Sequence, residues 1–332
     1  MRVLVLGGSV FLSRAVAQEH RAKGHDVTCL VRRPDGRLPT GVRTVAGDRA
    51  HGAIAYDEVR GPWDAVVDVA TDPTFVREAL DALGARVRHW TYVSSCSVYR
   101  DQDTAHLDES SAVVDPVGDG ALPGLEDYAT SKSASESRCA DALGDRLAVV
   151  RPGLIVGAGD PSDRGGYWAM RFLRDDRPVL VPVAAACAAQ WIDVRDVAQW
   201  IVQCAQEGLT GAFNAVGDPR SFHEMIEWTR TAVGHRGPLV EADDEWLVSH
   251  GVSPWAGPES LPMWIPSGAG MDGFLRRSNA RARRSGLRLR PFTETVAEIV
   301  SYETHRGLSR ERAAGLSPPR ERQLLRQLRV GG

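Results

Sequence analysis

The sequence predicts an α/β fold of the Rossmann type, in which a doubly wound parallel sheet is accompanied by a smaller C-terminal lobe. Three observations support this prediction. Strand-like and helix-like runs alternate through about the first two thirds of the chain. Each strand-like run is continuously apolar, which is typical of parallel strands covered on both faces. The first run ends in a glycine turn that leads directly into a helical pattern.

The first strand is expected at Arg2–Leu6, followed by the turn Gly7-Gly8-Ser9 and a helix from Phe11 to Lys23. Each later strand-like run is closed by Gly, Pro or charged residues. The further strands are expected at 26–31, 42–46, 65–69, 87–93, 146–150 and 211–216. A sheet domain is therefore predicted over residues 1–170 and 188–217.

The pattern of the sequence changes after this domain. Residues 171–187 and 218–305 hold short helical patterns, several prolines and a succession of tryptophans, and they predict the smaller lobe, which would bind the substrate. The remaining segment, 306–332, is rich in arginine and is expected to be a tail with one solvated helix.

Composition excludes several classes of function. The 332 residues carry a formal net charge of −3, which gives no electrostatic reason to expect nucleic acid or an acidic membrane as a partner. The five cysteines have neither disulfide nor metal spacing, so we expect reduced thiols and no metal site in a cytoplasmic protein. The N-terminal apolar run is too short for a signal peptide, and no run approaches the ~20 apolar residues of a membrane span.

The candidate catalytic residues are Tyr128 and Lys132, which share one helix face, and a serine from the run that ends the fifth strand. A phenol with an ordinary pKa near ~10 needs a neighbouring cation to act near neutral pH. Ser94, Ser95 and Ser97 each offer a hydroxyl at the strand tip. Such a set could polarise a carbonyl and pass it a proton, although a Tyr-x-x-x-Lys pair is also common on solvated helices.

The turn GGSVFLS is the candidate pyrophosphate site, because a helix N-terminus after the first strand offers unpaired N–H groups. Val10 and Ser13 stand where the dinucleotide fingerprint has glycine, so the position of the turn supports the site more than its motif does. The candidate cofactor contacts in the turn are Gly7, Ser9, Val10, Phe11 and Leu12.

Residues after the second, third and fourth strands would surround the adenosine. Arg32 and Arg33 stand where an NAD-preferring enzyme usually has an acid, so they favour the 2′-phosphate of NADP, with NAD(H) as the alternative. A solvated turn with arbitrary charge is the simpler interpretation of the two arginines. Asp48 is placed to accept from the adenine amino group, and Ala70-Thr71 to line the ribose.

With these residues assembled, the chain resembles the short-chain dehydrogenase/reductase superfamily, of the extended or atypical type grouped with NAD-dependent epimerases and dehydratases. The resemblance covers roughly 1–217 and rests on GGSVFLS, Gly47-Asp48, SSCSVY, YATSK, RPGLIVGAGD and WIDVRDVA. It implies that Tyr128 is the general acid/base, that Lys132 lowers the Tyr128 pKa while bonding the nicotinamide ribose, and that Ser95 holds the substrate oxygen. Pro152, after the sixth strand, is assigned to the cofactor site.

Departures from the family's patterns narrow the activity. Dehydratases of this family follow the Ser/Thr with an Asp-Glu pair, where this chain has Cys96 and Ser97, and sugar-nucleotide epimerases often carry an Asn where it has Pro152-Gly153-Leu154. The expected substrate contacts are Ser95, Cys96, Ser97, Leu154 and Trp168. We therefore predict an NADP(H)-dependent oxidoreductase acting on a small, partly apolar metabolite. An epimerase of a sugar or sugar nucleotide and a non-catalytic dinucleotide-sensing regulator are the alternatives, and related proteins often form homodimers.

Overall fold

A seven-stranded parallel sheet forms the first part of the molecule, in the computed structural model that describes residues 1–34, 38–116, 128–183 and 187–330. The strand order is β11-β6-β5-β4-β1-β2-β3, and every pair is parallel. The strands are β1 Arg2–Leu6, β2 Asp26–Val31, β3 Arg43–Ala46, β4 Trp63–Asp68, β5 Val87–Val93, β6 Leu147–Pro152 and β11 Gly211–Ala215. These bounds confirm the predicted doubly wound sheet, with each strand end within two residues of its expected position.

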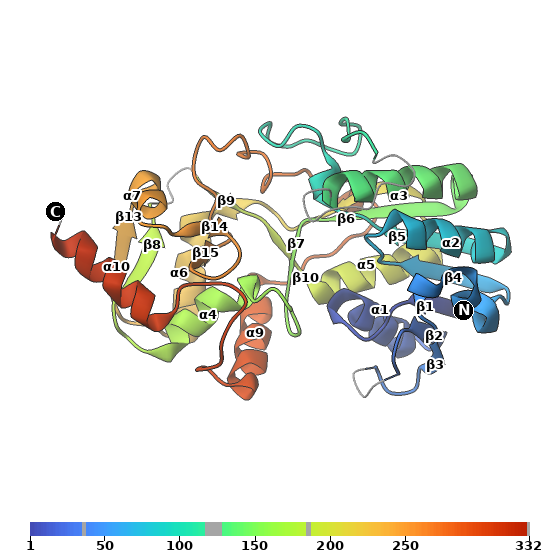
Figure 1. Cartoon of the computed structure of the whole chain (residues 1–332), viewed down its shortest axis with the longest axis horizontal. Coiled ribbons are helices and arrows are strands. Elements are labelled where there is room, and N and C mark those ends of the chain that lie inside the picture. Colours follow the sequence, from blue (N-terminus) through green and yellow to red (C-terminus); the bar gives the residue numbers. More distant parts are fainter. Residues whose placement is uncertain (35–37, 117–127, 184–186, 331–332) are drawn as a thin grey trace.

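Apolar side chains on both faces of the strands explain the helix layers. On one face, α1 (Phe11–Ala22) and α5 (Val194–Glu207) pack against the sheet, and α2 (Pro73–Leu83) and α3 (Tyr128–Leu143) cover the other (Figure 1). Strand order reverses between β1 and β4, so the crevice above this switch point lies at the carboxyl ends of the strands. Two 3₁₀ segments follow strands, η1 Arg49–Val59 after β3 and η3 Cys96–Val98 after β5, and two follow helices, η2 Gly84–Arg86 after α2 and η5 Gly144–Arg146 after α3.

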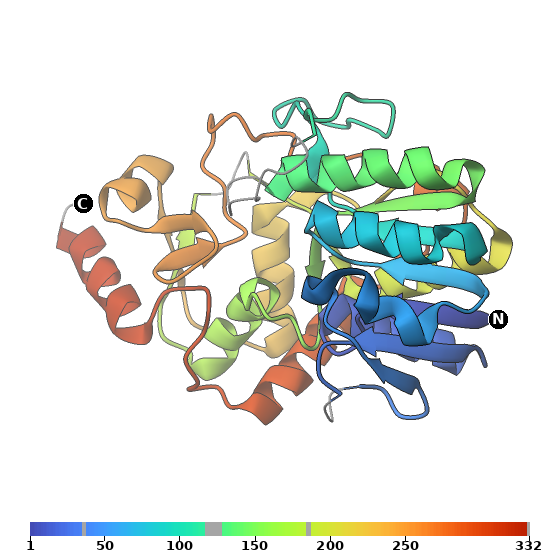
Figure 2. The ribbon, with the colours of Figure 1, turned by 45° about the vertical axis from the view of Figure 1, so that its right-hand side comes forward.

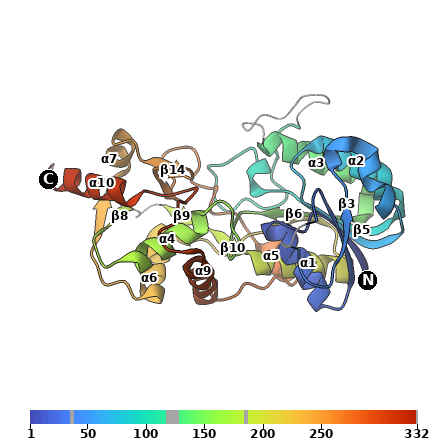
Figure 3. The same cartoon turned by 60° about the horizontal axis from the view of Figure 1, so that its bottom comes forward.

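The second lobe lies beside the carboxyl edge of the sheet and has its own core (Figures 1 and 2). Its helices are α4 Arg164–Arg174, α6 Phe222–Val233, α7 Asp244–Ser249, α9 Phe292–Arg306 and α10 Pro318–Val330. Two-stranded ladders complete it: β8 Val179–Pro182 with β13 Leu239–Ala242, β9 Ala188–Ala189 with β12 Arg220–Ser221, and β14 Ser253–Trp255 with β15 Ser260–Pro262. The ladder of β7 (Leu154–Val156) and β10 (Trp191–Asp193) runs between the two parts (Figure 3).

The observed cores correct two of the predicted boundaries. Helix α4, most of which was assigned to the sheet domain, packs in the second core because Trp168 and Phe172 are buried there. Helix α8 (Ala280–Arg284), assigned to the second lobe, instead returns to the sheet domain, where Ala282 and Leu287 join the core. Residues 184–186 and 331–332 lie outside the described part of the chain.

The C-terminal helix α10 is not the solvated tail that was expected. Leu324 is fully buried in the second core, and the Glu321 carboxylate accepts from Arg171 Nε at 2.5 Å and from Arg174 Nη2 at 3.0 Å. Because the segment is rich in arginine, its polar composition did not indicate that Leu324 and Glu321 attach α10 to the second lobe. Among the described residues, no helix has both the length and the apolar character needed to cross a bilayer.

Candidate active site

A cavity of about 290 Å³ opens where the carboxyl edge of the sheet meets the second lobe. The residues that surround it come from the ends of β5 and β6, the start of α3 and α4, and loops of the second lobe. They are Ser95, Cys96, Ser97, Tyr128, Gly153, Leu154, Arg164, Gln190, Trp255, Phe274 and Leu275. Four of the five predicted substrate contacts therefore lie on one cavity wall, together with the candidate general acid/base.

Trp168 is the exception among the predicted substrate contacts. Its indole is 1% exposed, donates from Nε1 to the Pro262 carbonyl at 2.9 Å, and packs edge-on against Phe222. Because it belongs to the core of the second lobe, it is not among the residues that surround the cavity. The prediction for Trp168 was wrong; the aromatic wall comes from Trp255 and Phe274 instead.

Ser95 follows β5 in extended conformation and caps η3. Its Oγ accepts from the Ser97 amide at 3.1 Å and lies 3.1 Å from Ser97 Oγ. A hydrogen bond also joins it to the Tyr128 phenol, where it lowers the phenol pKa. The serine is thus oriented by local backbone and placed against the tyrosine, as the resemblance implied.

Tyr128 begins α3 and keeps 41% of its surface exposed. Its pKa is raised because the surrounding protein desolvates the phenolate, and this shift is opposed by the Ser95 hydrogen bond and by the positive charge of Arg164. Arg164 is therefore a cation that favours the phenolate here. The expected lowering of the Tyr128 pKa by Lys132 stays a prediction.

Lys132 is buried beneath the site. Its ammonium donates to the carbonyl of Ala70 at 2.9 Å and to that of Val93 at 2.7 Å, at the ends of β4 and β5. Burial lowers its pKa to about 8, against the opposing effect of Asp68 and Glu136. Since an ammonium has three donors, one remains for a ribose hydroxyl.

The glycine turn fits a dinucleotide pyrophosphate. Gly7 and Gly8 have φ values of 133° and 124°, and a Cβ on Gly8 would lie 2.6 Å from Cys29 Sγ. Val10, half exposed, is the N-cap of α1 and makes no side-chain cap, so amides of the first turn stay open to an anion. The Ser13 hydroxyl, which accepts from Gly8 N at 3.0 Å and donates to the Val10 carbonyl at 2.8 Å, closes the turn.

The other predicted cofactor contacts follow β2, β3, β4 and β6 at the same edge of the sheet. Arg32 and Arg33 are exposed after β2, as is Thr71 after β4. Asp48 caps η1 by accepting from Ala50 N at 3.0 Å, so one of its oxygens is already engaged. Pro152 ends β6 and is buried beside β11.

Sequence reasoning missed a buried frame that holds α3 in place. Arg151 at the end of β6 makes a two-pronged ion pair with Glu136 of α3, at 2.9 and 2.6 Å, and donates to the Tyr99 hydroxyl at 3.1 Å. At the end of β4, Arg49 forms a second two-pronged ion pair, with Asp68, at N–O distances of 2.8 and 2.9 Å. Charged residues within or directly after apolar strands were the available signal for both pairs, because such residues are buried only with partners.

Arg164, Trp255 and Phe274 were also missed. Arg164 follows a loop rich in Gly, Asp and Pro, and the two aromatic residues lie about a hundred positions further along the chain, so no sequence spacing connects them. Only the packing of the second lobe brings all three to the cavity.

Comparison with known proteins agrees with this geometry. Residues 62–215 match the NAD dependent epimerase/dehydratase family. The chain is 28% identical over 253 residues to the epimerase family protein SDR39U1 of Bos taurus, an alignment that covers 70% of this chain and 81% of the relative.

Solved structures of the family share the fold. UDP-N-acetylglucosamine 4-epimerase from Bacillus cereus superposes with a TM-score of 0.69 at 16% identity, covering 95% of this chain and all of that one. UDP-glucose 4-epimerase from Thermus thermophilus, in complex with NAD, gives a TM-score of 0.59 at 20% identity, covering 92% of this chain and 99% of that one. These structures share the fold of this chain, and the match over residues 62–215 confirms the predicted resemblance to NAD-dependent epimerases and dehydratases.

Proposed function

We propose that this protein is an NADP(H)-dependent oxidoreductase that interconverts a carbonyl and an alcohol on a small, partly apolar metabolite. One observation carries the proposal: the hydroxyls of Ser95 and Tyr128 border one cavity of about 290 Å³, whose other walls combine apolar and aromatic side chains with a few polar ones. That volume is at the lower end of pockets that bind small molecules. It supports a small substrate.

The residues have distinct roles in the proposed reaction. The dinucleotide, when bound, supplies or accepts a hydride at its nicotinamide ring. Ser95 would hold the substrate oxygen, and Tyr128, which lines the same cavity, would donate a proton to that oxygen or remove it. Lys132, fixed by two main-chain carbonyls, would use its remaining donor to hold the nicotinamide ribose. Trp255 and Phe274 limit the access of water.

Turnover tests the proposal directly. Purified protein with NADPH is expected to reduce members of a panel of aldehydes and ketones, followed as loss of absorbance at the wavelength of the reduced nicotinamide. Absence of reduction across the panel, with wild type and Tyr128→Phe indistinguishable, would contradict it.

The preference for NADP rests on Arg32 and Arg33, which are exposed directly after β2, where the described residues 32–34 include no acid. Replacing both with alanine should weaken NADPH binding by about tenfold or more, since each guanidinium can form charge-assisted bonds to a 2′-phosphate. NADH binding should change little. Arg88→Ala, at an 86% exposed side chain near the amino end of β5, is the control. Equal weakening of both nucleotides would contradict an NADP preference.

The second candidate is a sugar-nucleotide epimerase, and likeness to the two UDP-sugar 4-epimerases favours it. An epimerase returns the hydride to its own substrate, so it keeps one nucleotide through many turnovers. Mass analysis of the nucleotide released on denaturation separates the candidates: tightly held NAD at near one equivalent supports the epimerase, and exchangeable NADP the oxidoreductase.

A further inference from the structure

Arg164 is the only charged side chain among the described residues that surround the catalytic cavity. It is half-buried at the start of α4, where Nε donates to Ser162 Oγ at 3.1 Å and the guanidinium lies 4.8 Å from the centre of the Trp255 ring. The Ser162 contact fixes the Nε side of the guanidinium, and the Trp255 ring lies against one of its faces. The two Nη groups, which carry four of its five donors, are not used by either contact.

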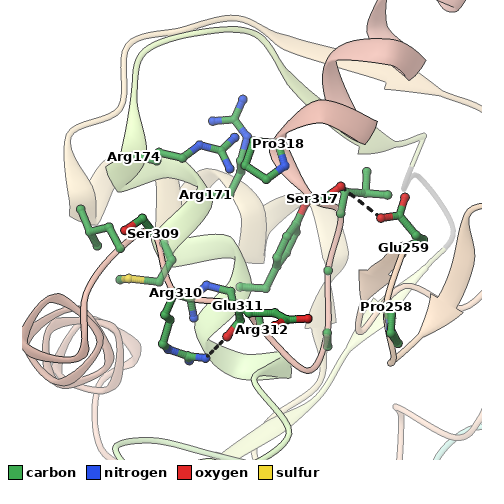
Figure 4. A pocket seen from close by; sticks show the side chains of 16 residues that line it. Arg171, Arg174, Pro258, Glu259, Ser309, Arg310, Glu311, Arg312, Ser317 and Pro318 are labelled. Atoms are coloured by element: carbon green, nitrogen blue, oxygen red, sulfur yellow. Dashed lines mark hydrogen bonds between the residues drawn. The ribbon is translucent and has the colours of Figure 1, made fainter.

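The arginines of a second cavity in the same lobe show the contrast (Figure 4). There Arg310 pairs with Asp163 and Glu303 at the back of the cavity, and Arg312 pairs with Glu303 at 2.7 Å. Arg171 is bound to Glu321 of α10. Each of these guanidinium groups is paired with a carboxylate of the protein itself, so this second cavity is lined by a structural ion-pair network.

Arg164 has no such partner. Within the described ranges, no carboxylate forms an ion pair with it; Asp160, the nearest acid to affect it, accepts instead from Ser162 and from the Gly165 amide. Burial lowers the Arg164 pKa, and the charge of Asp160 only partly opposes this. A desolvated cation without a counter-ion costs free energy, and an incoming anion would remove that cost.

The rest of the cavity defines what must connect the anion to the reacting carbon. Trp255 and Phe274 meet edge to face at 5.4 Å, and Leu154 and Leu275 complete the apolar wall. Trp255 has a φ of 67°, a left-handed conformation that is rare for a large side chain and is typically retained where function requires it. The wall suits a flat ring or a short hydrocarbon.

We propose that Arg164 is a specificity-determining residue, which selects substrates that carry an oxyanion, a carboxylate or a phosphate, at the end of an apolar body opposite the carbonyl. This inference rests on the proposed oxidoreductase function, because only that function makes the bound anion part of a substrate. The oxyanion subsite itself rests on Arg164, Ser162 and Trp255 alone.

An alternative role for Arg164, acting only on Tyr128, predicts a different effect of its removal on the rates for different substrates. If its charge only stabilises the Tyr128 phenolate, then removing it should slow all carbonyl substrates by the same factor and shift their pH profiles together. If it binds an oxyanion, the loss should depend on the substrate. The ratio between a charged and a neutral substrate therefore separates the two roles.

The kinetic test compares 4-carboxybenzaldehyde with 4-methylbenzaldehyde, which differ in the charge opposite the aldehyde. Wild type is expected to prefer the carboxylate, and Arg164→Gln to reduce the ratio of the two kcat/KM values by tenfold or more, mainly through KM. Arg164→Lys should restore part of the ratio, and Arg88→Gln should leave it unchanged. An equal loss for both aldehydes overturns the inference while leaving the oxidoreductase function standing.

A binding test needs no turnover. Benzoate, phenyl phosphate and benzyl alcohol are titrated into NADP⁺-loaded wild type and Arg164→Gln, with tryptophan fluorescence and calorimetry as readouts. Stronger binding of benzoate or of phenyl phosphate than of benzyl alcohol, lost in the variant, supports the subsite even if no aldehyde is reduced, and the stronger of the two identifies the anion. Equal binding of all three to wild type overturns it.

Discussion

The Lys132 ammonium lies 6.0 Å from the centre of the Tyr128 ring, one helical turn along α3, and donates to main-chain carbonyls rather than to the phenol. The two residues are therefore neighbours without a direct hydrogen bond. This arrangement leaves the phenol free for a substrate oxygen, and it fixes the lysine to the ends of β4 and β5, where a dinucleotide would cross the sheet edge.

Tyr128→Phe should lower kcat for carbonyl reduction by a factor of 10² to 10⁴, the usual range for a lost general acid. Stability should change little because the side chain is 41% exposed. The measurements are steady-state rates and urea unfolding. Tyr302→Phe on α9, which removes the same hydroxyl away from the cavity, should leave the rate unchanged. Undiminished turnover in Tyr128→Phe would remove the tyrosine from the mechanism.

The buried Lys132 should give the enzyme a basic pH limb. Its pKa of about 8 means that the ammonium loses its charge as the pH rises through 8. Since the charged form is the one that would hold the ribose, kcat/KM for NADPH, which reports the free enzyme, is expected to fall above pH 8. Lys132→Met should show a lower value without this limb. A wild-type profile that stays flat to pH 9.5 would contradict the assignment.

The sheet, and the placement of Ser95 and Tyr128 at one cavity, could be predicted from the sequence because their signals are local. Continuous apolar runs identified the strands, and one helical turn connects Tyr128 to Lys132. The electrostatics could not be predicted, since a cation that acts on the phenol is Arg164, which is 36 residues further along the chain and is brought there by the second lobe.

Trp168 illustrates the other limit. Its position after the sixth strand suggested the substrate wall, but helical periodicity alone does not say which side of α4 faces the cavity. Arg164, at the start of the same helix, faces the cavity, whereas Trp168, one turn later, is buried toward Pro262 and Phe222.

The glycine turn gives a prediction about stability and cofactor binding. Gly8→Ala is expected to lower the free energy of unfolding by about 2–4 kcal/mol, because φ of 124° is strained for alanine and the new Cβ would lie 2.6 Å from Cys29 Sγ. NADPH affinity should fall as the turn shifts. Gly24→Ala is the matched control: it has φ of 78° but no atom within 4 Å of the new Cβ, so only strain remains. Urea unfolding and nucleotide titration measure both. Equal costs in the two variants would mean that close packing at Gly8 is unimportant.

A buried histidine pair on the far side of the sheet domain predicts acid sensitivity. His20 is fully buried, its Nδ1 lies 2.8 Å from His25 Nδ1, and burial, followed by the charges of His25, the N-terminus and His89, lowers its pKa to about 3. The unfolded chain takes up this proton near pH 6.5 and the folded chain does not, so the stabilisation is complete above pH 6.5 and is lost as the pH falls toward 3. Between pH 6.5 and 5.0 the free energy of unfolding should fall by roughly 1.5 kcal/mol through this one group.

The test is the dependence of the free energy of unfolding on pH, measured by urea titrations at several pH values. His20→Leu should flatten this dependence, whereas His223→Leu at an exposed site should not. A slope that is the same in wild type and His20→Leu would show that other groups determine the acid response.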